Sequence, residues 1–439
     1  MWPYHPDLLA RPVPRYTSYP TAMEFDQHVG RSNQARALET IAAGTPASLY
    51  VHIPYCREIC WYCGCNTGAA NRSARLSGYL DALEQEILTV ARQLRHRARI
   101  DRIAFGGGSP NAVPPIRFVR LLDRLITEFD AANAQISIEL DPRTLDDDWY
   151  AVIAAARVAS ASLGCQTFTP HVQAAIGRIQ PLAMIETATA RLRAAGVTSL
   201  NFDLMYGLPR QSRDDLEATL SETIRLAPER IALFGYAHLP AAISRQRRID
   251  ARQLPGPRER FDHAALGFDR LTRAGYDAVG FDHFARPGDP LAIAARHGRL
   301  RRNFQGFTDD PSPLVLGLGA SAISLFPDLI VQNEKLAGRY RMLVTSGHLA
   351  GSRGIARPAD VRMRAAIIEQ LLCSRHAHIP GEILAPVRGL LGSFADRGLL
   401  VLGSDSLTIT PAGLPYARII AAAFDSYRSG AARGCSHAV

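Results

Sequence analysis

Four of the seven cysteines in the chain lie within ten residues, in the segment YVHIPYCREICWYCGCN. The first three, Cys56, Cys60 and Cys63, have the spacing C-x3-C-x2-C. Three thiolates in one short loop can each bind one iron of a 4Fe–4S cube and leave the fourth iron open to another ligand. Structural zinc sites usually take their ligands as two pairs from separated knuckles, so zinc is the less favoured alternative. The spacing predicts one 4Fe–4S cluster with Cys56, Cys60 and Cys63 as its protein ligands.

The fourth cysteine of this segment, Cys65, lies two residues beyond the last predicted ligand. If Cys65 also bound the cluster, every iron would carry a thiolate and none would stay open. We therefore expect Cys65 not to be a ligand. It either packs as a small buried residue or acts catalytically, as a thiol that assists hydrogen or electron transfer near the substrate.

The composition of the 439-residue chain is that of a soluble globular protein, with 47% apolar and 21% charged residues. No signal-peptide pattern is present, and no run of about 18 apolar residues is long enough to span a membrane. We therefore expect a cytoplasmic protein with no membrane span. The net charge of +9 comes almost entirely from arginine. Its basic clusters are short and dispersed, including RQRR at 245–248, so we expect a solvated surface and no nucleic-acid partner.

A short apolar run followed by a longer amphipathic segment repeats between about residues 46 and 240. This alternation predicts an α/β fold with right-handed crossovers and a parallel sheet, either doubly wound or closed into an open barrel. In both cases the chemistry gathers at the carboxyl ends of the strands. The expected strands are 48–53, 102–107, 135–140, 160–166, 199–207 and 230–238. The expected helices between them are 79–94, 115–129, 182–196 and 213–227.

Each expected strand ends in an unusual polar motif. The cysteine segment follows the first strand and GGGSP follows the second; the later strands end in ELDPR, CQTF, FDLMYGLP and GYAHLP. Because these ends meet at one side of a parallel sheet, the motifs predict one composite site.

We expect the chain to divide into three parts. We expect residues 1–40 to form an N-terminal arm or lid and residues 41–305 to form the catalytic domain. Residues 306–439 form an expected C-terminal, mostly helical domain that covers the site. Its order of helix, helix, hairpin and helix, with the last helix over 411–424, is similar to a winged helix. That last helix is mostly apolar, which argues against DNA binding.

The triple-cysteine motif after the first strand of a β/α series is identified as the signature of the radical S-adenosylmethionine superfamily. The aromatic pair before Cys63 and the glycines at 106–108 fit the same family. The resemblance implies a partial (β/α)6 TIM-like barrel. It also implies that S-adenosylmethionine chelates the open iron and is cleaved by one electron to a 5′-deoxyadenosyl radical.

Motifs along nearly the whole chain resemble the oxygen-independent coproporphyrinogen III oxidase (dehydrogenase) family. The haem-chaperone branch of the superfamily typically has an aromatic residue in place of Cys65 and lacks the RYTSYPTA segment. Three residues depart from the oxidase pattern: Asn111, Cys165 and Thr167. The matching motifs include PRYTSYPTA (14–22), YVHIPYC (50–56), CGCN (63–66), IELDPR (138–143), NFDLMYGLP (201–209), DHFARP (282–287) and LGLGASAIS (316–324).

The resemblance implies anaerobic oxidative decarboxylation of the propionates on rings A and B of coproporphyrinogen III. The vinyl product is protoporphyrinogen IX, an intermediate of haem biosynthesis. One 4Fe–4S cluster and two S-adenosylmethionine molecules are expected, with an unidentified electron donor and acceptor and a monomeric protein. The alternatives are another tetrapyrrole-acting enzyme of the superfamily, or a haem chaperone.

The family's binding residues carry over onto matching positions of this sequence. Tyr50 and His52 share one face of the first strand, and we expect both to be catalytic together with Cys65. The expected contacts of the first S-adenosylmethionine are Tyr50, Gly106, Glu139 and Ile323. The expected contacts of the second are Tyr62, Gly107, Gly108, Ser109, Gln166, Arg178, Asp203 and Ala237.

Four substrate carboxylates require cations, and arginine binds carboxylates in a bidentate fork. The candidates are Arg15, Arg286, Arg301 and Arg302, which the sequence does not rank. The proline-bounded arm is expected to fold over the porphyrinogen as a lid, with Tyr16 and Tyr19 as apolar walls.

Overall fold

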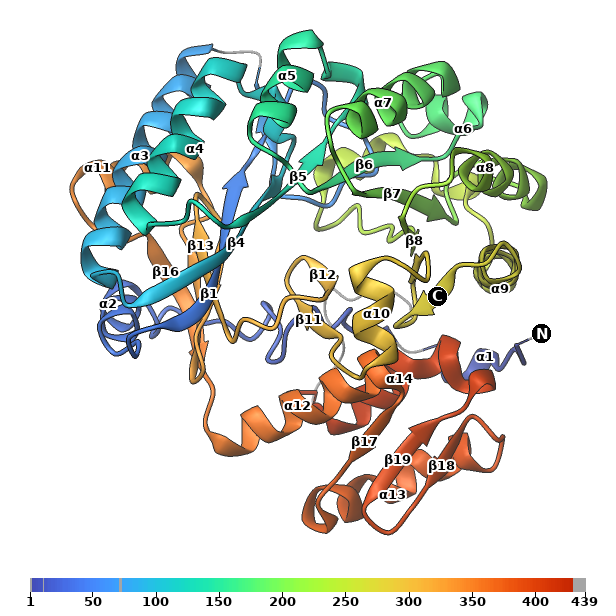
Figure 1. Cartoon of the computed structure of the whole chain (residues 1–439). Helices are drawn as coiled ribbons and strands as arrows, with labels where there is room; N and C mark the ends of the chain where they lie inside the picture. Colours follow the sequence, from blue (N-terminus) through green and yellow to red (C-terminus); the bar gives the residue numbers. More distant parts are fainter. Residues whose placement is uncertain (1, 11, 71–72, 429–439) are drawn as a thin grey trace.

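Six parallel strands follow one another in chain order across the centre of the structure (Figure 1). The computed structural model describes residues 2–10, 12–70 and 73–428. Each strand pairs in parallel with the next one along the chain. This confirms the predicted α/β series and its curved, barrel-like sheet. The strands are β1 Thr45–Ile53, β4 Ala98–Gly107, β5 Gln135–Leu140, β6 Ser160–Gln166, β7 Ser199–Tyr206 and β8 Arg230–Gly235.

Helices cover the outer side of this sheet (Figure 1). Their starts follow local rules: Pro115 opens α4 at its first turn, and Ser212 and Asp215 form a capping box at the start of α8. The short helix α5, which begins after the capping side chain of Asp146, was not predicted. The helices are α3 Ser73–Leu94, α4 Pro115–Phe129, α5 Asp147–Ala155, α7 Leu182–Ala194, α8 Arg213–Leu226 and α9 Pro257–Arg273.

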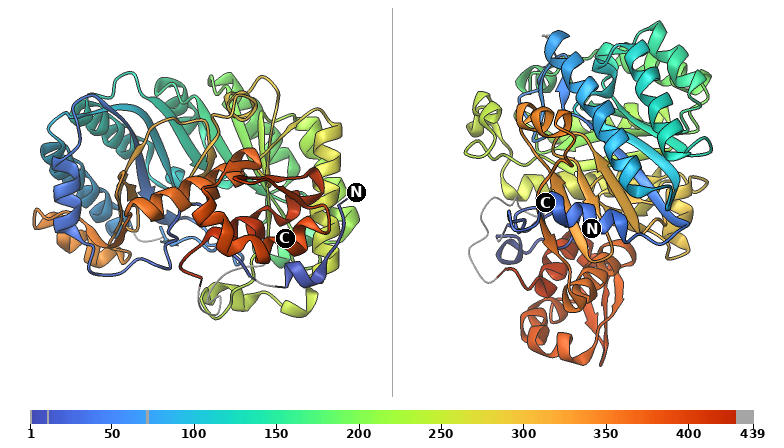
Figure 2. Two further views of the ribbon diagram at one scale, coloured as in Figure 1. Left: turned by 90° about the horizontal axis from the view of Figure 1, so that it is seen from below. Right: turned by 90° about the vertical axis from the view of Figure 1, so that its left-hand side faces the viewer.

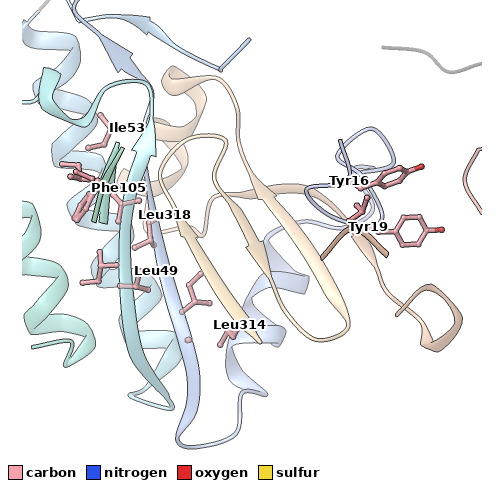
Figure 3. Packing of buried hydrophobic residues seen from close by; sticks show 14 of the residues in the cluster. Tyr16, Tyr19, Leu49, Ile53, Phe105, Leu314 and Leu318 are labelled. Carbon is pink, nitrogen blue, oxygen red and sulfur yellow. The ribbon is translucent and has the colours of Figure 1, made fainter. Parts of the chain in front are cut away.

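The two faces of the strands differ in chemistry. On β1, Leu49 and Ile53 are fully buried in the core beneath the helices (Figure 3). Alternation places Tyr50 and His52 on the opposite, inner face. The same alternation turns Glu139 of β5 and other polar residues of the central strands inward, so the interior of the barrel is polar.

The sheet continues beyond the six central strands on both sides. Among the described residues it contains 12 strands. On one side β13 (Leu314–Leu318) pairs in parallel with β1, and β14 (Ile323–Leu325), β15 (Leu329–Asn333) and β16 (Gly351–Ala356) follow it. On the other side β10 (His283–Ala285) lies antiparallel to β8, with β9 (Asp277–Val279) beyond it. The large sheet therefore crosses the predicted domain boundary at residue 305, and that division stays a prediction.

The C-terminal unit lies beneath the sheet (Figure 1) and contains α12 (Ala359–Ser374) and α13 (Gly381–Ala395). Its small sheet has the order β17, β19, β18, over His376–His378, Ser406–Ile409 and Leu400–Leu402.

The predicted helix over 411–424 is present, but only its middle is α-helical. A 3-10 helix over Pro411–Tyr416 continues into α14 (Ala417–Ala421) and then into a 3-10 turn over Ala422–Phe424. Pro415 has no N–H to donate to an α-helical ladder, which is consistent with 3-10 geometry in the first turns. The last expected residues of this unit, 429–439, lie outside the described part of the chain.

The N-terminal arm runs between the sheet and the C-terminal unit, from α1 (Pro6–Leu9) to α2 (Arg31–Glu39) (Figures 1 and 2). A hairpin of β11 (Arg301–Asn303) and β12 (Gly306–Thr308) lies beside it. Tyr16 donates to Asp425, and Tyr19 hydrogen-bonds Ser426. Both rings therefore anchor the arm to the C-terminal segment, and Figure 3 shows their hydroxyls pointing the same way. Within the described residues, no helix combines the length and the apolarity needed to cross a lipid bilayer.

Candidate active site

The cysteine segment forms a loop that leaves β1 and returns to it. Cys56 ends the two-residue strand β2 (Tyr55–Cys56), which pairs with β3 (Gly68–Ala69). The Gly68 N–H donates to the Pro54 carbonyl at 2.8 Å, and the Ala70 N–H donates to the Cys56 carbonyl at 2.8 Å. Closing the loop in this way fixes the direction of the cysteine side chains at the end of the parallel strands.

Two of the three predicted ligands have donors directed at their sulfur atoms. The Cys65 N–H lies 3.4 Å from the Cys63 sulfur, and hydrogen bonding from the Cys65 thiol lowers the pKa of Cys63 to about 6. The guanidinium groups of Arg178 and Arg143 lie 3.3 Å and 3.4 Å from the Cys60 sulfur. Donors and positive charge stabilise thiolates, which are the form that binds iron.

The third predicted ligand, Cys56, is a protonated thiol at neutral pH unless a cation stabilises its thiolate. Burial, with the neighbouring Cys63 and Cys60 sulfurs adding to it, raises the pKa of Cys56 to about 12. In the described residues, no three His, Cys, Asp or Glu side chains are placed to share one metal ion. A 4Fe–4S cube has a different requirement, because each of three irons takes one thiolate. The donors at Cys60 and Cys63 fit such a cluster.

The glycines at 106–108 are enclosed by other parts of the protein. A Cβ on Gly106 would lie 2.6 Å from the Glu139 carboxyl, and a Cβ on Gly108 would lie 2.6 Å from the Tyr55 carbonyl oxygen. Gly107 has φ +107°, and its Cβ would overlap the His52 ring. The motif therefore allows β4 to close onto β1 and β5, which is a structural reason for glycine beside any contact with a cofactor.

Two carboxylates face the interior from β5 and β7. Burial raises the pKa of Glu139 to about 7, although its Oε2 accepts a hydrogen bond from the Gly107 N–H at 3.0 Å. Burial also raises the pKa of Asp203, which accepts hydrogen bonds from Ser162 at 2.8 Å and from Asn201 at 2.9 Å. Such groups can accept hydrogen bonds from ribose hydroxyls or from an ammonium group.

Tyr50 and His52 contact each other on the inner face of β1. The Tyr50 hydroxyl lies 3.2 Å from His52 Nδ1, and the Ser321 hydroxyl lies 3.4 Å from His52 Nε2. Burial lowers the pKa of His52 to about 4, so the ring is neutral at pH 7. Ser321 lies two residues before Ile323, and this places the start of β14 beside the same site. The sequence motif LGLGASAIS contained Ser321, but its contact with His52 was not predicted.

The aromatic pair of the cysteine loop packs against a separate small cluster of apolar residues. Trp61 and Tyr62 contact this cluster, which contains Val172, Ile176, Leu208, Tyr236 and Ile249. The Trp61 N–H donates to the Ile176 carbonyl at 3.0 Å. These contacts fix the loop to the ends of β6, β7 and β8.

The segment RQRR at 245–248 is a solvated surface cluster only in part, because Arg247 and Arg248 are exposed but Gln246 and Arg245 contact the site. Gln246 is only 1% exposed, and its side-chain amide donates to the Tyr62 carbonyl at 2.8 Å and to the Ala237 carbonyl at 3.0 Å. Arg245 donates to the Thr67 hydroxyl at 2.6 Å. The segment therefore joins the cysteine loop to the end of β8. The burial of Gln246 could not be predicted from hydrophobic periodicity, because the segment forms a short 3-10 helix.

Gln166 and Arg178 lie at the end of β6. Gln166 has φ +64°, at a point where the register between β6 and β7 shifts; a non-glycine residue in this conformation is strained and often marks a functional site. Arg178 donates to the Gly164 carbonyl at 2.7 Å and to Asp141 at 3.2 Å, besides its contact with Cys60. Its role at a methionyl carboxylate stays a prediction.

The three departures from the family pattern have structural explanations. The Cys165 side chain is fully buried in the main core beneath the helices. The Thr167 hydroxyl lies 3.2 Å from that of Thr219 on α8. Asn111 accepts a hydrogen bond from Ser109 at 2.7 Å and donates to the Asp141 carbonyl at 2.8 Å. Cys165 and Thr167 therefore pack away from the interior, and Asn111 joins the ends of β4 and β5.

A buried network behind the site was not predicted. Glu86 of α3 accepts hydrogen bonds from the Gly319 N–H and from the Tyr340 hydroxyl, each at 2.6 Å. Tyr79 donates to the His52 carbonyl at 2.7 Å and accepts from the Ala320 N–H at 3.0 Å. The network holds the β13–β14 loop against β1. A signal was available, because Glu86 shares the buried face of an otherwise apolar helix stripe.

The expected site residues thus gather at one end of the parallel strands. The cysteine loop, the glycines, Glu139, Asp203 and the Tyr50–His52 pair face the same interior, and their individual roles stay predictions. Cys65 is exposed, so the alternative of a small buried packing residue is wrong, and its catalytic role stays a prediction.

Comparisons with known proteins agree with this geometry. The family model of the radical SAM superfamily matches residues 50–223. The oxygen-independent coproporphyrinogen III oxidase of Bradyrhizobium diazoefficiens is 40% identical over 426 residues, covering 94% of each chain. The enzyme of that name from Escherichia coli is 37% identical and covers 94% of this chain and 93% of its own.

The solved structure of a coproporphyrinogen III oxidase from Escherichia coli, described as a radical SAM enzyme, superimposes with a TM-score of 0.91. It is 35% identical and covers 97% of this chain and 99% of its own. The radical SAM family implies a 4Fe–4S cluster and S-adenosylmethionine as cofactors. The chain therefore belongs to the oxygen-independent coproporphyrinogen III oxidase family of radical SAM enzymes.

Proposed function

We propose that the protein decarboxylates the propionates on rings A and B of coproporphyrinogen III to vinyl groups, giving protoporphyrinogen IX without oxygen. One observation carries this proposal. The three-cysteine loop, Glu139 and Asp203 lie at one end of the parallel strands, in a chain whose relatives of that name match 94% of its length. Family membership supports the class of reaction, and the gathering of these side chains supports the choice of residues.

The residues that would hold the cofactors are carried over from the resemblance to the family, and their position at one end of the parallel strands supports the assignment. Cys56, Cys60 and Cys63 would bind three irons of the cluster and leave one iron for the first S-adenosylmethionine. The bound groups together would supply a carbon-centred radical able to break an unactivated C–H bond. Tyr50, Gly106, Glu139 and Ile323 would bind the first S-adenosylmethionine. Tyr62, Gly107, Gly108, Ser109, Gln166, Arg178, Asp203 and Ala237 would bind the second.

The protein's own groups supply position and polarity. The neutral His52 ring holds the Tyr50 hydroxyl and the Ser321 hydroxyl in fixed directions. Glu139 can carry a proton near neutral pH, because burial raises its pKa. A carboxyl group with a pKa near 7 can donate a hydrogen bond when it is protonated and accept from hydroxyl or ammonium donors when it is ionised.

Electron balance requires two partners from outside the chain. Each propionate loses one hydrogen atom, one carbon dioxide and one electron when it becomes a vinyl group. An electron donor must therefore start each turnover, and an acceptor must take the released electron. We propose that both are external. The monomeric state, the cytoplasmic location and the second S-adenosylmethionine stay predictions.

The test is anaerobic turnover. Protein reconstituted with iron and sulfide is incubated with S-adenosylmethionine, dithionite and coproporphyrinogen III, and the oxidised porphyrins are separated. Protoporphyrin formed in proportion to enzyme supports the proposal. Unchanged coproporphyrinogen together with tight binding of intact haem would favour the chaperone alternative, and a product from another tetrapyrrole would favour a different enzyme of the superfamily.

A further inference from the structure

Two arginines from distant parts of the chain lie near the carboxyl end of β8. Arg15 of the arm donates to the Gly235 carbonyl at 2.8 Å, and its guanidinium carbon lies 5.4 Å from the centre of the Phe234 ring. Arg302 of β11 lies 4.3 Å from the centre of the Phe307 ring. The two are neighbours, because Arg302 donates to the backbone carbonyl of Arg15 at 3.0 Å.

The charge of this pair is only partly balanced by the acidic groups around it. Asp282 is the carboxylate near both arginines; although burial opposes it, His283, Arg302 and Arg15 lower the pKa of Asp282. Asp282 also hydrogen-bonds the His283 ring at 2.7 Å. Arg418 adds positive charge beside Arg15. The side-chain hydrogen bonds of Arg15 and Arg302 go to neutral backbone carbonyls, whereas the Arg302 backbone N–H donates to the Glu369 carboxylate at 3.0 Å.

Arg302 also has an unused donor. Its Nη1 atom is buried and has no hydrogen-bond partner among the described residues. A buried guanidinium N–H without an acceptor is unfavourable, so its persistence points to an anionic ligand. Arg15, Asp282 and Phe281 line a cavity beside the carboxyl end of β8, and Arg302 lines a second cavity together with Tyr16 and Tyr19. Each arginine therefore combines positive charge with adjoining space.

The other two candidate arginines are already occupied. Arg301, next to Arg302 in the chain, pairs with Glu369 at 2.8 Å, and its side chain is 46% exposed. Arg286 lies over the Tyr276 ring at 5.3 Å, near the start of β8, where its N–H donates to the Glu229 carbonyl. This end of β8 is opposite the one that leads to the cysteine loop. The structure thus ranks Arg15 and Arg302 first.

An aromatic wall connects this pair to the interior of the barrel. The Phe234 and His283 rings lie 5.5 Å apart, and the His283 and Phe307 rings lie 5.2 Å apart, both in edge-to-face geometry. His283 is close enough to Asp203 to oppose the rise in pKa that burial causes there. The wall therefore runs from the inner carboxylates to the arginine pair, with polar groups at one end and cations at the other.

We propose that Arg15 and Arg302 bind a propionate carboxylate of the tetrapyrrole, and that Phe234, His283 and Phe307 line its pyrrole rings. The inference rests on the proposed function and assigns its substrate site. The arm supplies one of the two cations. Its role as a lid is then chemical as well as steric, since the carboxylate site is complete only when the arm is in place.

The test measures binding of coproporphyrin III, the stable fluorescent form of the ligand, to the reconstituted protein by fluorescence quenching. Arg15→Gln and Arg302→Gln should each weaken binding by about 10-fold or more, as expected for loss of a charge-assisted hydrogen bond. Arg301→Gln and Arg286→Gln are the matched controls and should bind like the wild type. The tetramethyl ester of coproporphyrin III, which has no carboxylate, should bind Arg15→Gln and the wild type equally.

These measurements distinguish an arginine that binds a carboxylate from one that only packs the arm in place. Equal loss of affinity for the acid and for the ester would show that the substitutions only disturb the arm, and it would overturn the inference. So would unchanged binding of the acid by both variants. Because Arg302 also anchors the arm, Arg302→Lys is measured too, and it should recover part of the affinity. Failure of the proposed function looks different, because the wild type would then form no protoporphyrin at all.

Discussion

Replacing Gly107 by alanine should destabilise the protein much more than replacing Gly196, although both glycines need a positive φ. Gly107 has φ +107° and Gly196 has φ +94°. Either substitution puts a side chain in a conformation that L residues rarely adopt, at a cost of about 1–3 kcal/mol. A Cβ on Gly196 has nothing within 4 Å, whereas a Cβ on Gly107 would overlap the His52 ring. Moving that ring adds an overpacking cost of about 1–3 kcal/mol.

The assay is urea unfolding of the apo protein, with Gly196→Ala as the matched control. We expect about 1–3 kcal/mol of destabilisation for Gly196→Ala and about 2–6 kcal/mol for Gly107→Ala, at an unchanged denaturant slope. Relieving the overlap also displaces His52 from Tyr50, so Gly107→Ala should lose binding of S-adenosylmethionine after reconstitution. Equal destabilisation by the two substitutions would refute the reasoning, because it would show that His52 moves freely and that the strand contact is loose.

Four further predictions follow from the same structure. Cys65→Ser should keep normal iron content yet lose most porphyrinogen turnover; loss of the cluster would make Cys65 a ligand, and full activity would show that its thiol has no role in turnover. Deletion of residues 1–24 should leave the cluster and cofactor cleavage intact but stop turnover, and normal protoporphyrinogen formation by the truncated protein would contradict the lid. Burial raises the pKa of Glu86 from 4.5 to about 7. As the pH rises, the Glu86 carboxyl therefore loses its proton in the unfolded chain before it does so in the folded protein. The free energy of unfolding should fall by about 3 kcal/mol between pH 4.5 and 7. Glu86→Gln should reduce this fall in the free energy of unfolding, measured by urea titrations at several pH values. If the pH profile of the variant equals that of the wild type, Glu86 is not the group responsible. Arg143→Gln removes a positive charge and a donor at the Cys60 sulfur, so an EPR-monitored titration should give a more negative cluster reduction potential; an unchanged potential would exclude this contact as a determinant.

Much of the scaffold could be predicted because it depends on local pattern. The six central strands coincide with their predicted positions, for example 135–140 and 160–166, since each is a short apolar run between turn residues. The predicted site lay at their carboxyl ends because parallel strands place these ends together. The positions of Glu139 and Asp203 on the inner face follow from the two-residue period of a strand.

Other features depend on contacts between distant residues, which a single sequence does not encode locally. Gln246 lies in a basic segment whose composition predicts solvent exposure, yet its side chain is buried against the cysteine loop. Arg178 contacts the Cys60 sulfur from 118 residues away. The apolar periodicity over 411–424 predicted a helix, but not the 3-10 geometry of its first turns around Pro415. Arg15 and Arg302 could be ranked only once the arm and the hairpin were placed side by side.

The most direct test of the central claim follows one hydrogen atom. Coproporphyrinogen III deuterated at the propionate carbon next to the pyrrole ring is turned over anaerobically with unlabelled S-adenosylmethionine. The 5′-deoxyadenosine is then analysed by mass spectrometry. Our account predicts deuterium in 5′-deoxyadenosine together with formation of protoporphyrinogen IX, and loss of both signals in Cys56→Ser. Protoporphyrinogen formed with no deuterium in 5′-deoxyadenosine, or deoxyadenosine formed with no vinyl product, would contradict it.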